Sequence, residues 1–133
     1  KLDALIISNT TIERPKFLKN NYRYENGGLS GQPLFQESTR LLKNVYNISN
    51  GKIDLIGVGG VENANQAYTK ILVGASFVQL YTGLLFQGPK IVKVITKKIL
   101  KYLKRDGYKT INDAVGTLSL KDALKLNKLE NFD

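Results

Sequence analysis

Three short apolar runs separate longer amphipathic segments along the chain. The runs occupy residues 4–7, 53–58 and 75–81, and small polar or glycine-rich residues follow each of them. Runs of this length without strict alternation are typical of strands in a parallel sheet that is covered on both faces. We therefore expect three strands, each buried on both sides.

Each predicted strand is followed by a segment in which apolar residues recur every three to four positions. The first such stripe ends at Asn50-Gly51, a pair that commonly ends a helix. The second has Asn63 as a candidate N-cap and Gly74 after its end. The third begins at Pro89 and ends near Asp106-Gly107. The order strand-helix, repeated three times, predicts an α/β fold with parallel strands.

Two segments interrupt this alternation. Residues 13–32 form a long polar connection, and connections of this length are usually functional or disordered. Residues 118–133 alternate leucine with lysine and asparagine, a pattern compatible with one further short helix.

Composition removes several classes of chemistry. The 133 residues contain neither cysteine nor histidine, which excludes disulfides, thiolate metal sites and a Ser-His-Asp triad within this segment. No apolar run approaches the roughly 18 residues that a membrane-spanning helix needs. The net charge of +9 invites a nucleic-acid or acidic-membrane partner, but much of the excess lies in residues 90–105, where a solvated outer helix face explains it.

The turns after the second and third predicted strands have the composition of a phosphate site. Gly57–Gly60 follows the second strand, and Tyr81-Thr82-Gly83 follows the third, one strand-helix unit later. Glycine lets backbone N–H groups approach an anion, and Thr82 adds a hydroxyl donor. Each turn alone is compatible with an ordinary tight turn. Two such turns at adjacent strand ends favour phosphate binding, as in barrels of alternating strands and helices.

The turn after the first predicted strand, Ser8–Thr11, consists of small polar residues. Asn9 offers both an acceptor oxygen and an NH₂ donor, which match an amide or imide edge of a ligand. The same residues are also frequent in capping and Asx-turn positions. The pattern alone leaves both interpretations open.

Several motifs together resemble a known family. In the order and near the spacing seen here, they resemble dihydroorotate dehydrogenase, most closely the membrane-associated, quinone-using class. The resemblance covers nearly all of residues 1–116. The motifs that carry it are Ser8–Arg14, Gly27–Gly31 followed by Pro33-Leu34, Ile56–Gly60, Gly74–Thr82, Gly88-Pro89 and Asp113–Gly116.

The resemblance implies a fold and a role for individual residues. The implied fold is α/β, the C-terminal portion of a (β/α)8 TIM barrel, with three βα units in residues 1–116 and a tail of unknown role in residues 117–133. Asn9 and Thr10 match the pair that hydrogen-bonds the orotate ring. The positions that match contacts to the FMN cofactor are Ser8, Gly31, Gly60, Tyr81 and Thr82, the last three at its phosphate.

The resemblance also implies what the segment lacks. The catalytic serine base, a flavin-contacting lysine and the helical segment that meets the membrane and quinone are expected before residue 1. We therefore expect no catalytic residue and no metal site here, and no activity from this chain alone. The complete enzyme would oxidise dihydroorotate to orotate in de novo pyrimidine biosynthesis, with quinone as acceptor, as a peripheral protein of a bacterial cytoplasmic membrane. The segment alone would be soluble.

Other interpretations follow from the same residues. Another FMN-binding barrel, such as a dihydrouridine synthase, would use the +9 charge for RNA, but Asn9-Thr10 and the Gly27 loop argue against it and against a nucleic-acid partner. An inactive truncated remnant or fragment is a second alternative. Because three strands would leave sheet edges open, we also expect self-association or a complementary N-terminal half as partner.

Overall fold

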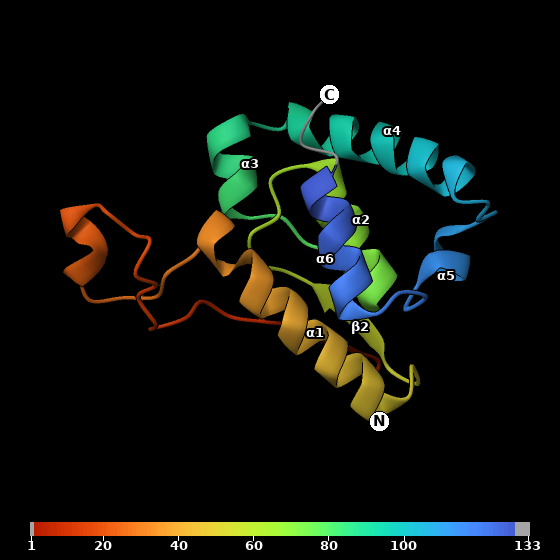
Figure 1. Ribbon diagram of the computed structural model, residues 1–133, viewed down its shortest axis with the longest axis horizontal. Helices are drawn as coiled ribbons and strands as arrows, with labels where there is room; N and C mark the ends of the chain where they lie inside the picture. Colours follow the sequence, from red (N-terminus) through yellow and green to blue (C-terminus); the bar gives the residue numbers. More distant parts are fainter. Residues whose placement is uncertain (1, 130–133) are drawn as a thin grey trace.

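The computed structural model describes residues 2–129 and has a parallel three-stranded sheet packed against helices (Figure 1). The elements in chain order are β1 (Ala4–Ile7), the 3-10 helices η1 (Asn21–Tyr24) and η2 (Gln32–Leu34), α1 (Phe35–Ser49), β2 (Asp54–Gly57), α2 (Ala64–Val73), β3 (Phe77–Val78), α3 (Thr82–Gln87), α4 (Lys90–Arg105), α5 (Ile111–Ala114) and α6 (Leu120–Leu129). The predicted alternation of strands and helices is confirmed.

The sheet has the order β1-β2-β3, and both pairs of neighbours are parallel. β3 is shorter than the predicted strand, because only Phe77 and Val78 pair in register with β2. Two further hydrogen bonds extend the contact on either side, from Ser76 N to Leu55 O and from Gln79 N to Gly57 O. The backbone then turns away into α3, a helix that the apolar pattern did not predict.

Among residues 2–129, helices cover one face of the sheet and leave the other exposed. Leu55 is fully buried and packs with Leu42 of α1 and Val73 of α2, so that the helices lie on this face. On the opposite face Ile6 is 58% exposed and Phe77 is 61% exposed. The expectation that the strands are buried on both sides is therefore wrong for this chain, because successive side chains of a strand point to opposite faces and helices cover only one of them.

Helix ends follow the local sequence. Asn50 adopts a left-handed conformation (φ 51°) after α1. The Asn63 side chain caps α2 by accepting a hydrogen bond from Gln66 N at 2.9 Å, and the Gln66 side chain in turn accepts one from Glu62 N at 2.7 Å. Gly74 follows the end of α2. These caps confirm the predicted boundaries.

α4 packs across α2 through one apolar stripe. Ile91, Ile95, Ile99 and Leu103 are its buried residues, while lysines occupy its outer side. The Tyr68 hydroxyl of α2 donates to Asp106 at 2.8 Å, just beyond the end of α4. Burial, reinforced by that carboxylate, raises the pKa of Tyr68, which therefore stays a neutral donor.

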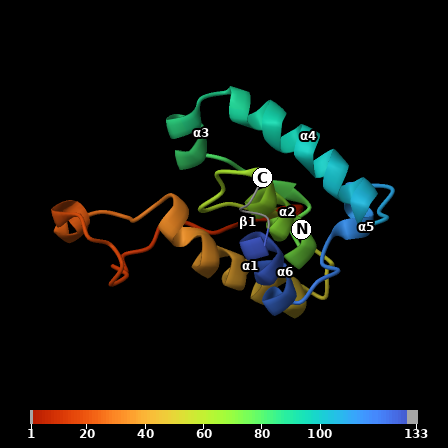
Figure 2. The ribbon, with the colours of Figure 1, turned by 45° about the horizontal axis from the view of Figure 1, so that its top comes forward.

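The predicted helix in the tail is α6, which lies against α1 and α2 (Figure 2). Its Ala123 is fully buried beside Leu42 and Leu55. Before it, the backbone N–H groups of Gly116 and Leu118 donate to carbonyls at the end of α2, at 3.1 and 3.0 Å. Residues 130–133 of the tail lie outside the described residues. In the part that is described, no helix is long and apolar enough to cross a bilayer.

The uncovered sheet face generates the first prediction. Ile6 and Phe77 expose apolar surface beside strand edges, so the 133-residue chain should self-associate at low micromolar concentration. The double substitution Ile6→Thr and Phe77→Thr should shift the sedimentation profile towards the monomer. Ile48→Thr is the matched control, because Ile48 is 82% exposed but lies on α1. A monomeric wild-type chain with a cooperative thermal transition would contradict the prediction.

Candidate functional site

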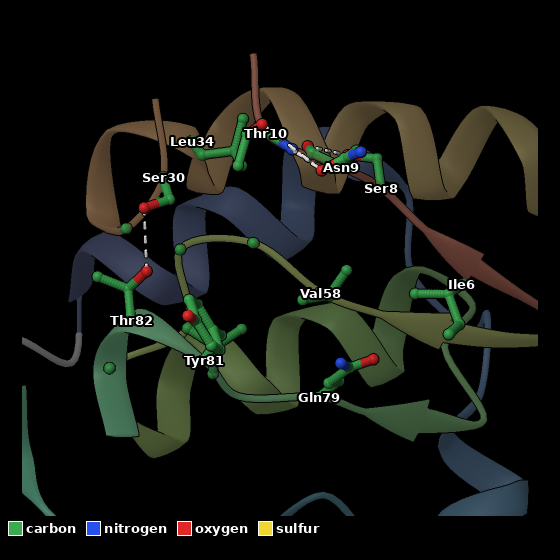
Figure 3. Close-up of a pocket in the computed structure, with 15 residues that line it drawn as sticks. Ile6, Ser8, Asn9, Thr10, Ser30, Leu34, Val58, Gln79, Tyr81 and Thr82 are labelled. Carbon is green, nitrogen blue, oxygen red and sulfur yellow. Dashed lines mark hydrogen bonds between the residues drawn. The ribbon is translucent and has the colours of Figure 1, made fainter. Parts of the chain in front are cut away.

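A pocket of about 380 Å³ opens where the three strands end (Figure 3). Its walls come from the turns that follow β1, β2 and β3, and from Ser30, Gly31 and Leu34 of the long connection. All seven residues that the sequence singled out line it: Ser8, Asn9, Thr10, Gly31, Gly60, Tyr81 and Thr82. The structure thus brings together residues that lie up to 74 positions apart.

The turn after β1 presents amide and hydroxyl groups to this pocket. The Asn9 side-chain oxygen accepts the backbone N–H of Thr10 at 2.8 Å, which fixes the orientation of the amide. Its NH₂ group then has no protein acceptor among the described residues. Asn9 is exposed, so this NH₂ group can donate to a ligand in the pocket.

The long connection is attached to this turn at its base. Thr11 and Leu29 form an isolated antiparallel bridge, with N–H to O distances of 3.2 and 2.7 Å. Beside the bridge, a Cβ at Gly28 would lie 1.9 Å from the Thr10 hydroxyl oxygen. Glycine is therefore required at this position, because only a bare backbone leaves room for the Thr10 side chain.

Arg14 holds the rest of the connection, which extends away from the body of the molecule (Figure 1). Its guanidinium donates to the backbone carbonyls of residues 11, 13, 23, 25 and 27, at distances between 2.6 and 3.3 Å. Arginine suits this position since its planar group carries five N–H donors in a fixed geometry. Arg14 thereby closes the connection into a loop and returns it to the pocket at Ser30.

The turn after β2 packs so closely on α1 that side chains are excluded. Gly59 and Gly60 have φ angles of 98° and 72°. A Cβ at Gly60 would lie 2.5 Å from the backbone N and Cα of Phe35, and a Cβ at Gly59 would lie 2.9 Å from Ser38 Cβ. Among the described residues no acceptor is recorded for the backbone N–H groups of Gly59, Gly60 and Val61. These groups can donate to a bound anion.

The turn after β3 meets the glycine turn and the long connection. A Cβ at Gly83 would lie 2.3 Å from Val61 O, so the two turns are in backbone contact. The Thr82 hydroxyl lies 3.1 Å from Ser30 Oγ, and a Cβ at Gly31 would be 3.1 Å from Thr82 Cγ2 (Figure 3). Thr82 therefore ties the third strand end to the connection across the pocket.

The sequence interpretation did not single out Gln79, Ser30 or Val58, which also line the pocket. Gln79 lies two residues after Phe77 and points into the pocket (Figure 3). A polar residue within an apolar strand segment is a signal that could have identified it. Every lining residue is uncharged. In residues 2–129 there is also no group of three side chains suited to a metal ion. An anionic ligand here would therefore be held by N–H and O–H donors.

Comparison with known proteins identifies similar chains. The family profile described as dihydroorotate dehydrogenase matches residues 1–103. Dihydroorotate dehydrogenase (quinone), mitochondrial, from Arabidopsis thaliana is 51% identical over 116 residues, which are 86% of this chain and 25% of that protein. The protein with the same description from Mus musculus is 46% identical over 115 residues, 86% of this chain and 29% of that protein.

A solved structure of a related protein has a similar fold. The ligand-free enzyme described as DHODH from Eimeria tenella superposes with a TM-score of 0.84 at 39% identity. The superposition covers 87% of this chain and 32% of that one. The chain thus spans between a quarter and a third of the length of these relatives.

The Arg14 contacts generate the second prediction. Replacing Arg14 by Gln removes most of the donors that hold five carbonyls, so the connection should open more easily. We expect the free energy of local opening across residues 11–31 to fall by about 1–3 kcal/mol. Amide hydrogen exchange would measure this. Arg40→Gln is the control, since Arg40 makes one exposed pair with Glu37. Equal exchange in both variants would show that Arg14 does not hold the connection.

Proposed function

Because the chain belongs to the dihydroorotate dehydrogenase family, its three βα units being part of a (β/α)8 barrel, we propose that it supplies the FMN- and substrate-binding edge of an enzyme that oxidises dihydroorotate to orotate. One observation carries the proposal. Three separate strand ends and one long connection converge on a single pocket, and all seven residues implied by the family resemblance line it.

The donor set of the pocket suits the phosphate of FMN. The N–H groups of the Gly59–Val61 turn and the Thr82 hydroxyl are neutral donors at the contact between the turns after β2 and β3. A phosphate bound there would be held without a charged side chain, in the manner of other anion sites formed by backbone N–H groups. Gly60 and Tyr81 would complete this part of the site, while Ser8 and Gly31 would contact the remainder of the cofactor.

The substrate end of the pocket lies at the turn after β1. Asn9 would donate its NH₂ group to a carbonyl of the dihydropyrimidine ring, and Thr10 would offer its hydroxyl beside it. The hydrogen bond from Thr10 N to Asn9 holds the amide before a ligand arrives, which lowers the entropic cost of binding. When bound, FMN supplies the two-electron acceptor, a chemistry that protein side chains do not offer.

The proposal assigns the remaining functions to other parts of a complete enzyme. In this chain no lining residue of the pocket is a strong base, so proton removal from the substrate would come from a residue outside it. Quinone would reoxidise the flavin, as the descriptions of the Arabidopsis and mouse relatives suggest. Peripheral association with a membrane is the corresponding location, and biosynthesis of pyrimidines the corresponding pathway.

A chimera tests the proposal. Residues 1–116 would replace the corresponding segment of the Arabidopsis protein, which is 51% identical over 116 residues. The purified chimera should contain flavin and oxidise dihydroorotate with a quinone acceptor. A folded chimera that lacks flavin would refute the cofactor assignment and favour an inactive remnant.

Within the chimera, Thr82→Val should weaken FMN retention about tenfold, because the Thr82 hydroxyl, which donates to Ser30 Oγ in this structure, can no longer turn to the phosphate. Thr96→Val is the matched control, since within the described part of the chain the Thr96 hydroxyl bonds to Val92 O of α4 and lies outside the pocket. Gly60 is unsuitable for this purpose. Any side chain there meets the Phe35 backbone, so a loss of flavin could reflect a loss of folding.

Asn9 generates a separate prediction for the substrate. Asn9→Ala in the chimera should lower dihydroorotate affinity about ten- to hundredfold, since a buried hydrogen bond to a ligand contributes roughly 1–3 kcal/mol. Asn9→Asp keeps an acceptor for Thr10 N but loses the NH₂ donor, so it should be impaired as severely. Flavin content should stay unchanged in both variants. Wild-type affinity in Asn9→Asp would mean that Asn9 serves only the turn.

A further inference from the structure

Lys70 of α2 is a lysine side chain with no exposed surface. Its ammonium group lies 2.9 Å from Ser38 Oγ and 3.2 Å from Thr39 Oγ1, and 5.3 Å from the centre of the Phe35 ring. Among residues 2–129 no carboxylate forms an ion pair with it. A buried cation without a counter-charge is costly for folding, so its presence calls for an explanation in function.

The surroundings of Lys70 lead directly to the pocket. Its stem passes beneath the end of β2, where a Cβ at Gly57 would lie 3.0 Å from Lys70 Cδ. Ser38 Oγ, which accepts from Lys70, lies 3.0 Å from Gly59 O and 3.1 Å from Phe35 O. Because the Ser38 oxygen accepts a hydrogen bond from the Lys70 ammonium, its own O–H can donate to these two carbonyls. Lys70 is thus connected to the glycine turn through one hydroxyl.

We propose that Lys70 is a positioning residue for the anion-binding turn, acting through the Ser38 hydroxyl on the Gly59 carbonyl. The hydrogen bond from Ser38 holds the Gly59 carbonyl. Because the N–H of Gly60 belongs to the same peptide unit, the bond also fixes the direction of that N–H. The ammonium also places a positive charge behind a pocket whose lining is uncharged. This inference rests on the proposed function for the identity of the anion, the FMN phosphate, but the link between Lys70 and the turn is a property of the chain itself.

The charged side chains on the elements around Lys70 have partners other than its ammonium. On α1, Glu37 pairs with Arg40 at the surface, and Lys43 lies over the Tyr46 ring. On β2 the exposed Asp54 accepts from Ser76, and on α6 the exposed Asp122 pairs with Lys125. The groups that face the Lys70 ammonium are therefore two hydroxyls and an aromatic ring.

Burial lowers the pKa of Lys70 from its ordinary value of 10.5 to about 7. In the unfolded chain the ordinary value returns, so the unfolded state binds more protons between pH 7 and 10.5. The destabilisation by Lys70 is therefore fully present below pH 7 and disappears as pH rises towards 10.5. A bound phosphate favours the charged form, which means that anion binding and protonation of Lys70 reinforce each other.

The relay can be tested by NMR on the 133-residue chain. In the absence of ligand, the backbone amide signals of Gly59 and Gly60 should show a pH inflection that matches the titration of the Lys70 side-chain ¹³Cε. Lys70→Met should abolish this inflection. Ser38→Ala should also abolish it at Gly60, whose N–H shares a peptide unit with the Gly59 carbonyl, while Lys70 itself still titrates. Thr39→Val is the matched control, since Thr39 contacts Lys70 but donates to Phe35 O and not to the turn.

FMN binding by the same variants in the chimera gives the functional readout. Lys70→Met and Ser38→Ala should raise the dissociation constant about tenfold at pH 6, with Thr39→Val close to wild type. Lys70→Met should meanwhile unfold at a higher temperature than wild type at pH 6, and this advantage should shrink as pH rises. A purely structural role predicts the opposite, a variant that is less stable.

The outcomes separate the two proposals. A glycine inflection that survives in Ser38→Ala, or equal FMN affinity in Lys70→Met and wild type, would overturn the relay. Failure of the wild-type chimera to bind FMN, together with an intact inflection that depends on Ser38, would refute the cofactor assignment and leave the relay standing.

Discussion

The contact between the Gly59–Gly60 turn and the first turns of α1 is the constraint on which the pocket depends. At Gly60 a single Cβ would approach the Phe35 backbone to 2.5 Å, so the approach is possible for glycine alone. The same turn touches the start of α3 through Val61 O and Gly83. Two strand ends and two helices therefore converge without side chains between them. What remains at their meeting point is backbone, whose N–H groups have no acceptor among the described residues and can donate to a ligand.

Much of this arrangement could be predicted from the sequence because it depends on local signals. Each local signal involves residues that lie within a few positions of one another in the sequence. The signals are the capping pair Asn63 and Gln66, the left-handed Asn50 and the glycine turns. The pocket was predictable for a related reason. Carboxyl ends of parallel strands lie at one edge of a sheet, so polar residues after each strand must meet there.

The features that could not be predicted depend on tertiary contacts. Nothing near Lys70 in the sequence indicates Ser38 or Thr39, which lie on another helix and more than 30 positions away. The five carbonyls around Arg14 likewise come together only when the connection folds back on itself. The exposure of Ile6 and Phe77 escaped prediction since apolar runs do not reveal how many elements cover a sheet. The apolar pattern of a strand is the same in a closed barrel, where both faces are buried, and in this chain, where one face is exposed.

Lys70 and Arg14 are two positively charged side chains that are held by uncharged partners. Each is a cation that forms no ion pair with a carboxylate among residues 2–129. Arg14 donates directly to backbone carbonyls, whereas Lys70 donates to two hydroxyls, one of which donates to the Gly59 carbonyl. Arg14 works at the surface, where water screens its charge and the cost of leaving it unpaired is small. Lys70 lies in the interior, where an unpaired charge costs folding free energy, and burial lowers its pKa to about 7. A carboxylate partner would remove that cost, but it would also cancel the positive potential behind the turn. Without such a partner among residues 2–129 the positive potential remains, and a phosphate bound at the turn would recover part of the stability that the buried charge costs.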